Sequence, residues 1–191
     1  DEPGADAVTH LRRQRELLQG QVSHLQQMLL SIDTILDMQQ LGGRLSLAET
    51  VEIWGTDWDP VYLAEAQAKW GDTEEWAESA RRKARMTRAD WEQAHSETVA
   101  LETALAEAMH SGVEPGSPEA NALARWHRKD LNRWFEVSTS KQVVIARSYV
   151  ADERYARYYD KRAPGLAAWL KDVIDAGARS EGVEPATATW E

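Results

Sequence analysis

The chain has 191 residues, of which 42% are hydrophobic and 28% charged, and its formal net charge is -10 at pH 7. This length and composition fit a soluble protein that can bury a hydrophobic core. Because an acidic chain is repelled by phosphate, we do not expect this segment itself to bind nucleic acid. The absence of cysteine excludes disulfides, thiolate nucleophiles and cysteine-bound metals, and is compatible with the reducing cytoplasm, where we expect the protein to be found.

The sequence shows no targeting or membrane signal. Its first residues, Asp1-Glu2-Pro3-Gly4, are neither basic nor apolar, so we do not interpret them as a signal peptide. No apolar run approaches the roughly 20 residues that a membrane-spanning helix needs. Because the chain does not begin with Met and a helical pattern starts almost at once, we expect it to be part of a longer protein.

Residues 7–40 carry the heptad pattern of a coiled coil. Apolar residues alternate at steps of three and four, and only Arg15 interrupts this seam. Because a repeat of about 3.5 residues keeps one seam against a partner helix, we predict a homodimer formed through residues 1–43. The predicted interface positions are Val8, Leu11, Leu18, Val22, Leu25, Leu29, Ile32 and Leu36. The pattern does not distinguish parallel from antiparallel pairing. The alternative to a coiled coil is an ordinary amphipathic helix that packs inside one domain.

Short helices with clear start signals are predicted between residues 44 and 112. Residues 45–54 and 62–70 are expected to be helical, and a glycine at position 71 ends the second of these helices. Asp72 with Glu75, and Thr87 with Asp90, have the spacing of a capping box. We therefore expect a new helix after each pair, and the second of these should be long.

This stretch is rich in tryptophan and poor in large aliphatic residues. Its tryptophans are Trp54, Trp58, Trp70, Trp76 and Trp91. With so little Leu, Ile or Val between residues 63 and 98, the segment cannot form much of a core alone. We therefore predict that residues 44–112 form a lid, which becomes stable when a ligand fills the space beneath it. The alternative is that the tryptophans only anchor these helices to the rest of the domain.

Residues 117–178 are predicted to form the helical core of a domain that spans residues 44–178. Ser117-Pro118 is a strong helix start, and apolar residues at helical spacing extend that helix to Trp134-Phe135. Asp152 is expected to cap a further helix, and an amphipathic helix follows it. Residues 179–191 are small and polar and are expected to form a flexible tail. Because we find no convincing strand, the predicted fold class is all-α.

Patterns typical of catalysis or cofactor binding are absent. The sequence has no glycine-rich phosphate loop, no HExxH helix and no nucleophile beside a base, so we interpret the chain as a non-enzyme without metal or cofactor. Its five histidines are scattered. His127 follows Trp126 on a helix that should line the core. It is either a hydrogen-bonded core residue, which is the more common case, or a ligand contact.

Several short motifs between Tyr62 and Ala176 are weak singly and specific in combination. They are Glu65-Ala66, Trp70-Gly71-Asp72-Thr73, Ser79 with Arg82, Thr87 to Trp91, Ala124 to His127, Trp134-Phe135, Tyr149-Val150-Ala151-Asp152 with Tyr155, Tyr159-Asp160-Lys161 and Gly165-Leu166-Ala167. In this order they resemble the effector region of MerR-family regulators of the TipA type, which recognise thiopeptide antibiotics.

This resemblance implies a globin-like, all-helical fold without haem, in which the ligand lies between the core and an N-terminal lid that orders on binding. It also implies a dimerisation helix, normally an antiparallel coiled coil, preceded in the full-length protein by a winged helix-turn-helix DNA-binding domain. The implied ligands are bulky, heteroaromatic and mostly uncharged, and indole and phenol rings suit them because they bury large areas at low entropy cost. The residues expected to contact ligand are Trp70, Trp76, Trp91, His127, Trp134, Phe135, Ser138 and Tyr149.

The chain departs from the family where a reactive cysteine would be expected. In the family's best-known member, a cysteine just after the region matching Trp134-Phe135 captures a dehydroamino acid of the antibiotic. Here that neighbourhood is Glu136-Val137-Ser138, and a serine hydroxyl is a poor nucleophile without a nearby base. We therefore expect reversible binding. Met86 also stands where the family often has Tyr.

The favoured hypothesis for function is a drug-sensing effector domain. Ligand binding would order the lid and signal to a DNA-binding domain that activates transcription, which requires different ligand affinities in two states. Promoter DNA would be contacted only through that missing domain. The alternatives are a stand-alone protein that sequesters antibiotic, a purely structural helical dimer, and a haem-binding globin.

Overall fold

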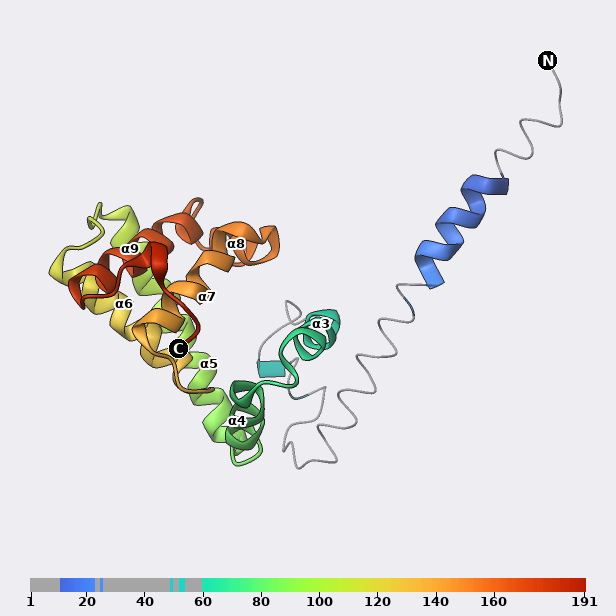
Figure 1. The fold of residues 1–191 in the computed structure, drawn as a ribbon, viewed down its shortest axis with the longest axis horizontal. Coiled ribbons are helices and arrows are strands. Elements are labelled where there is room, and N and C mark those ends of the chain that lie inside the picture. The colour runs from blue at the N-terminus through green and yellow to red at the C-terminus, as the bar shows by residue number, and fades with distance from the viewer. Residues whose placement is uncertain (1–10, 23–24, 26–48, 50–51, 54–59) are drawn as a thin grey trace, which may run out of the picture. The chain divides into compact units, whose positions relative to one another are not determined.

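The computed structural model describes residues 11–22, 25, 49, 52, 53 and 60–191, and the regular structure in these residues is helical throughout (Figure 1). The helices are α3 (Pro60–Trp70), α4 (Glu74–Lys83), α5 (Arg88–His110), α6 (Pro118–Leu131), α7 (Thr139–Ala151), α8 (Glu153–Asp160), α9 (Leu166–Ser180) and the 3-10 helix η1 (Pro185–Thr187). The predicted all-α fold class is therefore confirmed. Residues 1–77 and 78–191 form two separate compact units.

Much of the predicted coiled coil, and most of the predicted helix at 45–54, lies outside the described residues. Residues 11–22 and Leu25 are helical, and their apolar side chains are exposed, Leu11 at 62% and Leu18 at 59%. The predicted interface positions Val8, Leu29, Ile32 and Leu36 lie outside the described residues. Apolar side chains that are exposed at heptad positions of a single chain can pack against a second helix. The homodimer stays a prediction.

The helix predicted for residues 62–70 is present as α3, and a helix follows it closely, as expected. The cap of α4 differs from the prediction by one residue. The hydroxyl of Thr73, and not Asp72, accepts a hydrogen bond from the Trp76 N–H at 3.2 Å, and it also donates to the Trp70 carbonyl at 2.7 Å. The spacing of Asp72 and Glu75 did not predict this cap. Thr73 replaces Asp72 because its hydroxyl can donate to a carbonyl at the end of α3 and also accept an N–H at the start of α4, whereas a carboxylate can only accept.

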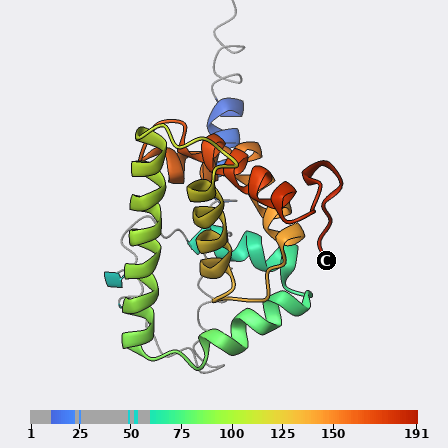
Figure 2. The same ribbon diagram turned by 90° about the vertical axis from the view of Figure 1, so that its left-hand side faces the viewer.

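The helix starts predicted at Thr87 and Ser117 are confirmed. Thr87 donates its backbone N–H to the Asp90 carboxylate at 2.7 Å and accepts the Asp90 N–H at 3.3 Å, which completes a capping box for α5. Ser117 accepts the Ala120 N–H at 3.1 Å at the start of α6. The two helices pack together and run antiparallel (Figure 2).

Helix α6 ends at Leu131, whereas the apolar pattern predicted that it runs on to Trp134-Phe135. The reason is the side chain of Asn132. Its amide nitrogen donates to the Val137 carbonyl at 3.1 Å, and its amide oxygen accepts the Val137 N–H at 2.9 Å. An asparagine side chain can replace backbone partners in this way, so it turns the chain out of the helix between residues 132 and 138.

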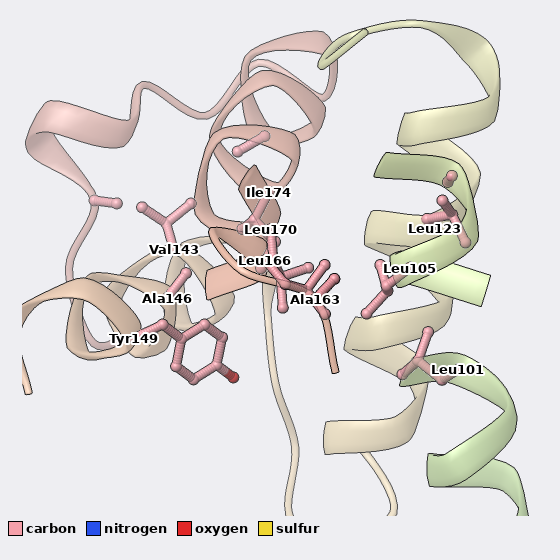
Figure 3. Close-up of a cluster of buried hydrophobic side chains, with 13 residues drawn as sticks. Leu101, Leu105, Leu123, Val143, Ala146, Tyr149, Ala163, Leu166, Leu170 and Ile174 are labelled. Atoms are coloured by element: carbon pink, nitrogen blue, oxygen red, sulfur yellow. The ribbon is translucent and has the colours of Figure 1, made fainter. Parts of the chain in front are cut away.

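The hydrophobic core gathers around α9, which packs against α5, α6, α7 and α8. Leu166, Leu170 and Ile174 of α9 face Leu105 of α5 and Val143 of α7, and each of these five side chains is at most 1% exposed (Figure 3). Gly177 lets α9 approach α6 closely, because a Cβ there would lie only 3.1 Å from the Ala124 Cβ. Gly165, with φ of +87°, supplies the left-handed residue that precedes α9.

The end of the chain contradicts the predicted flexible tail at residues 179–191. Helix α9 continues to Ser180, η1 follows, and both Pro185 and Ala188 are buried. The Arg147 guanidinium on α7 donates to the Pro185 carbonyl at 2.7 Å and to the Ala188 carbonyl at 3.0 Å. Small polar residues can therefore be ordered when side chains elsewhere in the fold satisfy their backbone groups.

Candidate ligand-binding site

Two of the predicted ligand contacts, Trp91 and Trp134, lie against one another. Their ring centroids are 5.5 Å apart and their planes are tilted by 33°. Trp91 lies in the first turn of α5, and Trp134 lies in the turn that Asn132 creates after α6. Both indoles are only half-buried. The pair thus presents an aromatic surface that can stack with a flat ligand.

A lysine adjoins this pair. The Lys83 ammonium lies 5.3 Å from the Trp134 ring centroid, within the range of a cation–π contact. Burial lowers the pKa of Lys83, because its surroundings disfavour the charged form. Lys83 ends α4 and was not among the residues singled out in the sequence, where a lysine near a helix C-terminus carries no specific signal.

A second contact joins α4 to the turn after α6. The Arg82 guanidinium donates to the carbonyls of Asn132 and Arg133 and, at 2.5 Å, to the Glu78 carboxylate. Glu78 also accepts the Glu136 N–H at 3.1 Å, and this hydrogen bond is the main cause that lowers the pKa of Glu78. Arg82 and Glu78 therefore link the last turns of α4 to the turn that carries Trp134.

His127 and Tyr149 are also brought together, in a buried polar network. Gln142 donates to the Ala124 carbonyl at 2.8 Å and lies 3.0 Å from His127 Nδ1. Because a carbonyl only accepts, the Gln142 amide nitrogen must face it, and its second N–H then points to Nδ1. We therefore assign the His127 proton to Nε2, which donates to the Tyr149 hydroxyl at 3.1 Å. Burial lowers the pKa of His127 to about 4, so the ring is neutral at pH 7.

Two further tyrosines pack against the Tyr149 ring. Its ring centroid lies 4.9 Å from that of Tyr159 and 6.2 Å from that of Tyr155. Burial raises the pKa of both Tyr149 and Tyr159, so their hydroxyls remain protonated. Tyr158 packs edge-on against Tyr159 and donates to the buried Glu102 carboxylate on α5.

His127 and Tyr149 are 3% and 4% exposed, and their polar atoms are paired with protein groups. This arrangement supports the interpretation of His127 as a hydrogen-bonded core residue. The sequence did not identify Gln142 as a partner of His127, or Tyr159 as a neighbour of Tyr149, although Tyr159 belongs to a quoted motif. Contact of His127 or Tyr149 with a ligand stays a prediction.

Acid is expected to destabilise the protein through His127. The pKa is about 4 when folded and 6.5 in the unfolded chain, so the unfolded state binds the proton first as the pH falls. Stability is therefore fully present above pH 6.5 and is lost toward pH 4, by about 2 kcal/mol between pH 7 and pH 5. In His127→Gln, which keeps an N–H donor for Tyr149, urea unfolding should lose about 2 kcal/mol less over that interval. An equal loss in both proteins would assign the acid sensitivity to carboxylates such as Glu97.

Phe135 and Ser138 form a third group, with the end of the chain. Ser138 caps α7, since its hydroxyl accepts the Lys141 N–H at 3.0 Å and donates to the Glu191 carbonyl. The Phe135 ring lies 6.2 Å from the Trp190 ring, with the planes tilted by 32°. Trp190 was missed because it fell in the expected flexible tail.

Trp70 and Trp76 belong to the other compact unit, residues 1–77. Trp70, at the end of α3, is 39% exposed, and the Lys69 ammonium lies 4.9 Å from its ring centroid. Trp76 lies half-buried in the first turn of α4. Six of the eight predicted ligand contacts therefore have neighbours within residues 78–191, where they form three groups. The other two, Trp70 and Trp76, lie in the first unit.

A shallow groove of about 390 Å³ lies elsewhere, at the C-terminal end of α5 and the start of α6, with Leu123 and Trp126 in its wall and none of the predicted contacts. Among the described residues, no group of His, Asp or Glu side chains is arranged to hold a metal ion. In the same part of the chain, no helix is long and apolar enough to cross a bilayer.

Fold and site together define an all-helical domain with half-buried indoles at the ends of its helices, suited to binding a flat aromatic ligand. Residues 62–176 match the TipAS antibiotic-recognition domain, and the chain belongs to this family. The resemblance noted in the sequence is thereby confirmed.

Known relatives agree with this assignment. The chain is 33% identical over 180 residues to the HTH-type transcriptional activator TipA of Streptomyces coelicolor, covering 93% of this chain and 71% of TipA. It is 27% identical over 188 residues to the HTH-type transcriptional regulator SkgA of Caulobacter vibrioides, covering 94% of this chain and 72% of SkgA. The fold is similar, with a TM-score of 0.65 and 29% identity, to Streptomyces lividans TipAS solved in complex with nosiheptide, over 72% of this chain and 96% of that one.

Proposed function

We propose that this chain is a drug-sensing effector domain that binds bulky heteroaromatic antibiotics of the thiopeptide kind. The observation that carries the proposal is the similarity in fold and sequence to TipAS, whose structure was solved with nosiheptide. The aromatic surface formed by Trp91 and Trp134 supports it, because stacked indoles bury large flat ligands with little loss of side-chain entropy.

Binding is reversible in this proposal. The chain has no cysteine that could form a covalent adduct. The Ser138 hydroxyl is already engaged, as the cap of α7 and as a donor to the main-chain oxygen of Glu191, and a serine hydroxyl is a poor nucleophile unless a base activates it. The ligand is therefore held by stacking, hydrogen bonds and burial of apolar surface.

The lid in this proposal is shorter than residues 44–112. Within α5, Leu101 and Leu105 are buried in the main core, so the second half of that helix belongs to the core. By contrast, every residue of α4 keeps part of its surface exposed. We propose that the segment from α3 to the first half of α5 is marginally stable alone and becomes ordered when ligand binds.

The signal would pass from ligand to DNA through a dimer. TipA and SkgA are named as HTH-type regulators, and the chain covers only about seven-tenths of each. We propose that a DNA-binding segment of the full-length protein contacts the promoter, and that the predicted coiled coil, which includes the helix at 11–22, joins two copies. The exposed apolar side chains of Leu11, Leu18 and Val22 support such an interface.

The substitution Leu25→Asp is expected to produce a monomer. Leu25 is 56% exposed in a single chain, and a carboxylate at this position would be desolvated in the apolar seam of a dimer. Sedimentation equilibrium should give the wild type a molecular mass twice that of the variant. Glu16→Gln, on the same helix but outside the predicted seam, should leave the dimer intact. A variant that remains dimeric would place the interface elsewhere.

The function is tested by titrating the protein with nosiheptide and following tryptophan fluorescence, with hydrogen exchange on the free and bound forms. A saturable signal, with new protection in residues 60–98 and release of intact ligand on denaturation, is the expected result. If no thiopeptide gives a signal and residues 60–98 are already protected in the free protein, the tryptophans are structural and the proposal fails.

A further inference from the structure

Residues 181–191 lie beyond the residues that match the TipAS family, yet the domain holds their backbone in place. Besides the two hydrogen bonds from Arg147, the Ser140 hydroxyl donates to the Thr189 carbonyl at 2.8 Å and accepts the Thr189 N–H at 3.0 Å. The Arg128 guanidinium and the Thr139 hydroxyl both donate to the Glu181 carboxylate, each at 2.7 Å. None of these contacts uses the side chain of Trp190.

Because the backbone is held at both Thr189 and Glu191, the place of the Trp190 indole between them is defined. It lies against Phe135, and the Lys141 ammonium is 5.9 Å from its ring centroid. Trp190 and Phe135 are each only half-buried. Two aromatic rings with open area, flanked by a cation, form a surface that gains free energy when a flat apolar molecule covers it.

The two aromatic pairs are neighbours along the chain. Phe135 directly follows Trp134, whose ring meets Trp91, so the turn after α6 supplies one ring to each pair. A ligand with several linked heteroaromatic rings is long enough to use more than one aromatic contact, and lysine ammonium groups can donate to the ring nitrogens or carbonyls of such a ligand.

We propose that Trp190, together with Phe135, contacts the antibiotic, so that the C-terminal segment helps to decide which heteroaromatic ligands this chain accepts. The proposal rests on the proposed function and adds a contact outside the matched residues. A purely structural role, in which the indole only shields Phe135 from water, is the alternative that the experiment separates.

The test compares the affinity for nosiheptide, by isothermal titration calorimetry, of the wild type, Trp190→Ala and Trp190→Phe. We expect Trp190→Ala to weaken binding roughly tenfold, as for an aromatic contact at the edge of a site, and Trp190→Phe to restore most of the loss. The melting temperature of the free protein should change little, because the contacts of Arg147 and Ser140 remain. Trp126→Ala removes an indole that is 39% exposed on α6 and should leave the affinity unchanged.

Each other outcome has a distinct meaning. Wild-type protein that binds no thiopeptide overturns the proposed function and this inference with it. Wild-type protein that binds nosiheptide while Trp190→Ala binds equally well overturns only the inference. A variant in which affinity and melting temperature fall together, and which Trp190→Phe does not rescue, identifies Trp190 as part of the fold and also overturns the inference.

Discussion

Replacing Leu170 with alanine is expected to lower the free energy of unfolding by about 3 kcal/mol. Leu170 is fully buried on α9, in the same cluster as Leu105, Leu166 and Ile174. Because α9 packs against each of the helices from α5 to α8, its neighbours are held from several sides and cannot collapse into the space that the side chain leaves. The loss therefore combines the hydrophobic transfer term with the cost of a cavity.

Urea unfolding followed by circular dichroism measures this effect, provided that the dependence on denaturant stays the same. The matched control is Val150→Ala on α7, where the side chain is 45% exposed and the expected change is below about 0.5 kcal/mol. A loss of less than about 1 kcal/mol for Leu170→Ala would show that the helices relax into the cavity and that the core is less tightly packed than the structure indicates.

The substitution Trp134→Ala is expected to weaken nosiheptide binding by about 2 kcal/mol, or roughly 30-fold. It removes one of the two indoles that face each other at 5.5 Å and also the ring beside the Lys83 ammonium. Trp91 and Lys83 then lose the Trp134 ring as a neighbour, and the Trp91 indole alone offers a ligand a smaller area for stacking. The dissociation constant from calorimetry and the melting temperature of the free protein should be measured together.

Trp169→Ala is the contrasting control. This indole packs against the core and donates to the Val113 carbonyl at 3.2 Å, so its loss should lower stability and leave affinity nearly unchanged. Trp134→Phe, which keeps an aromatic ring, should recover part of the affinity. If Trp134→Ala binds nosiheptide as tightly as the wild type, the pair of Trp91 and Trp134 lies outside the ligand site.

Helix starts were predicted well because they depend on neighbouring residues. The caps at Thr87, Ser117 and Asp152 each involve a side chain and a backbone N–H no more than three residues apart. At Asp152 the Arg154 side chain also donates to the carboxylate, which lowers the pKa of Asp152 to about 2. Such contacts form within a single turn of chain, so their spacing can be recognised without knowledge of the fold.

The ends of elements were predicted less well. Apolar spacing continued past Leu131, but Asn132 binds the backbone of Val137 and turns the chain away. The composition of residues 179–191 indicated disorder, but the deciding contacts come from Arg147 and Ser140, which lie 38 and 49 residues before their partners. A prediction from local composition cannot include partners that become neighbours only after folding.

For the candidate site too, some features could be predicted from local sequence and others could not. Residue types and motif order predicted the family and drew attention to Trp91, Trp134, His127 and Tyr149. Helical periodicity, the caps and the absence of a thiol could be predicted from the amino-acid sequence, because they depend on neighbouring residues or on composition. Folding was needed to show that Trp91 and Trp134 pair at an aromatic surface, while His127 and Tyr149 are hydrogen-bonded in the core. Tertiary packing also brought Trp190 beside Phe135, since burial and long-range hydrogen bonds exist only once the helices have come together.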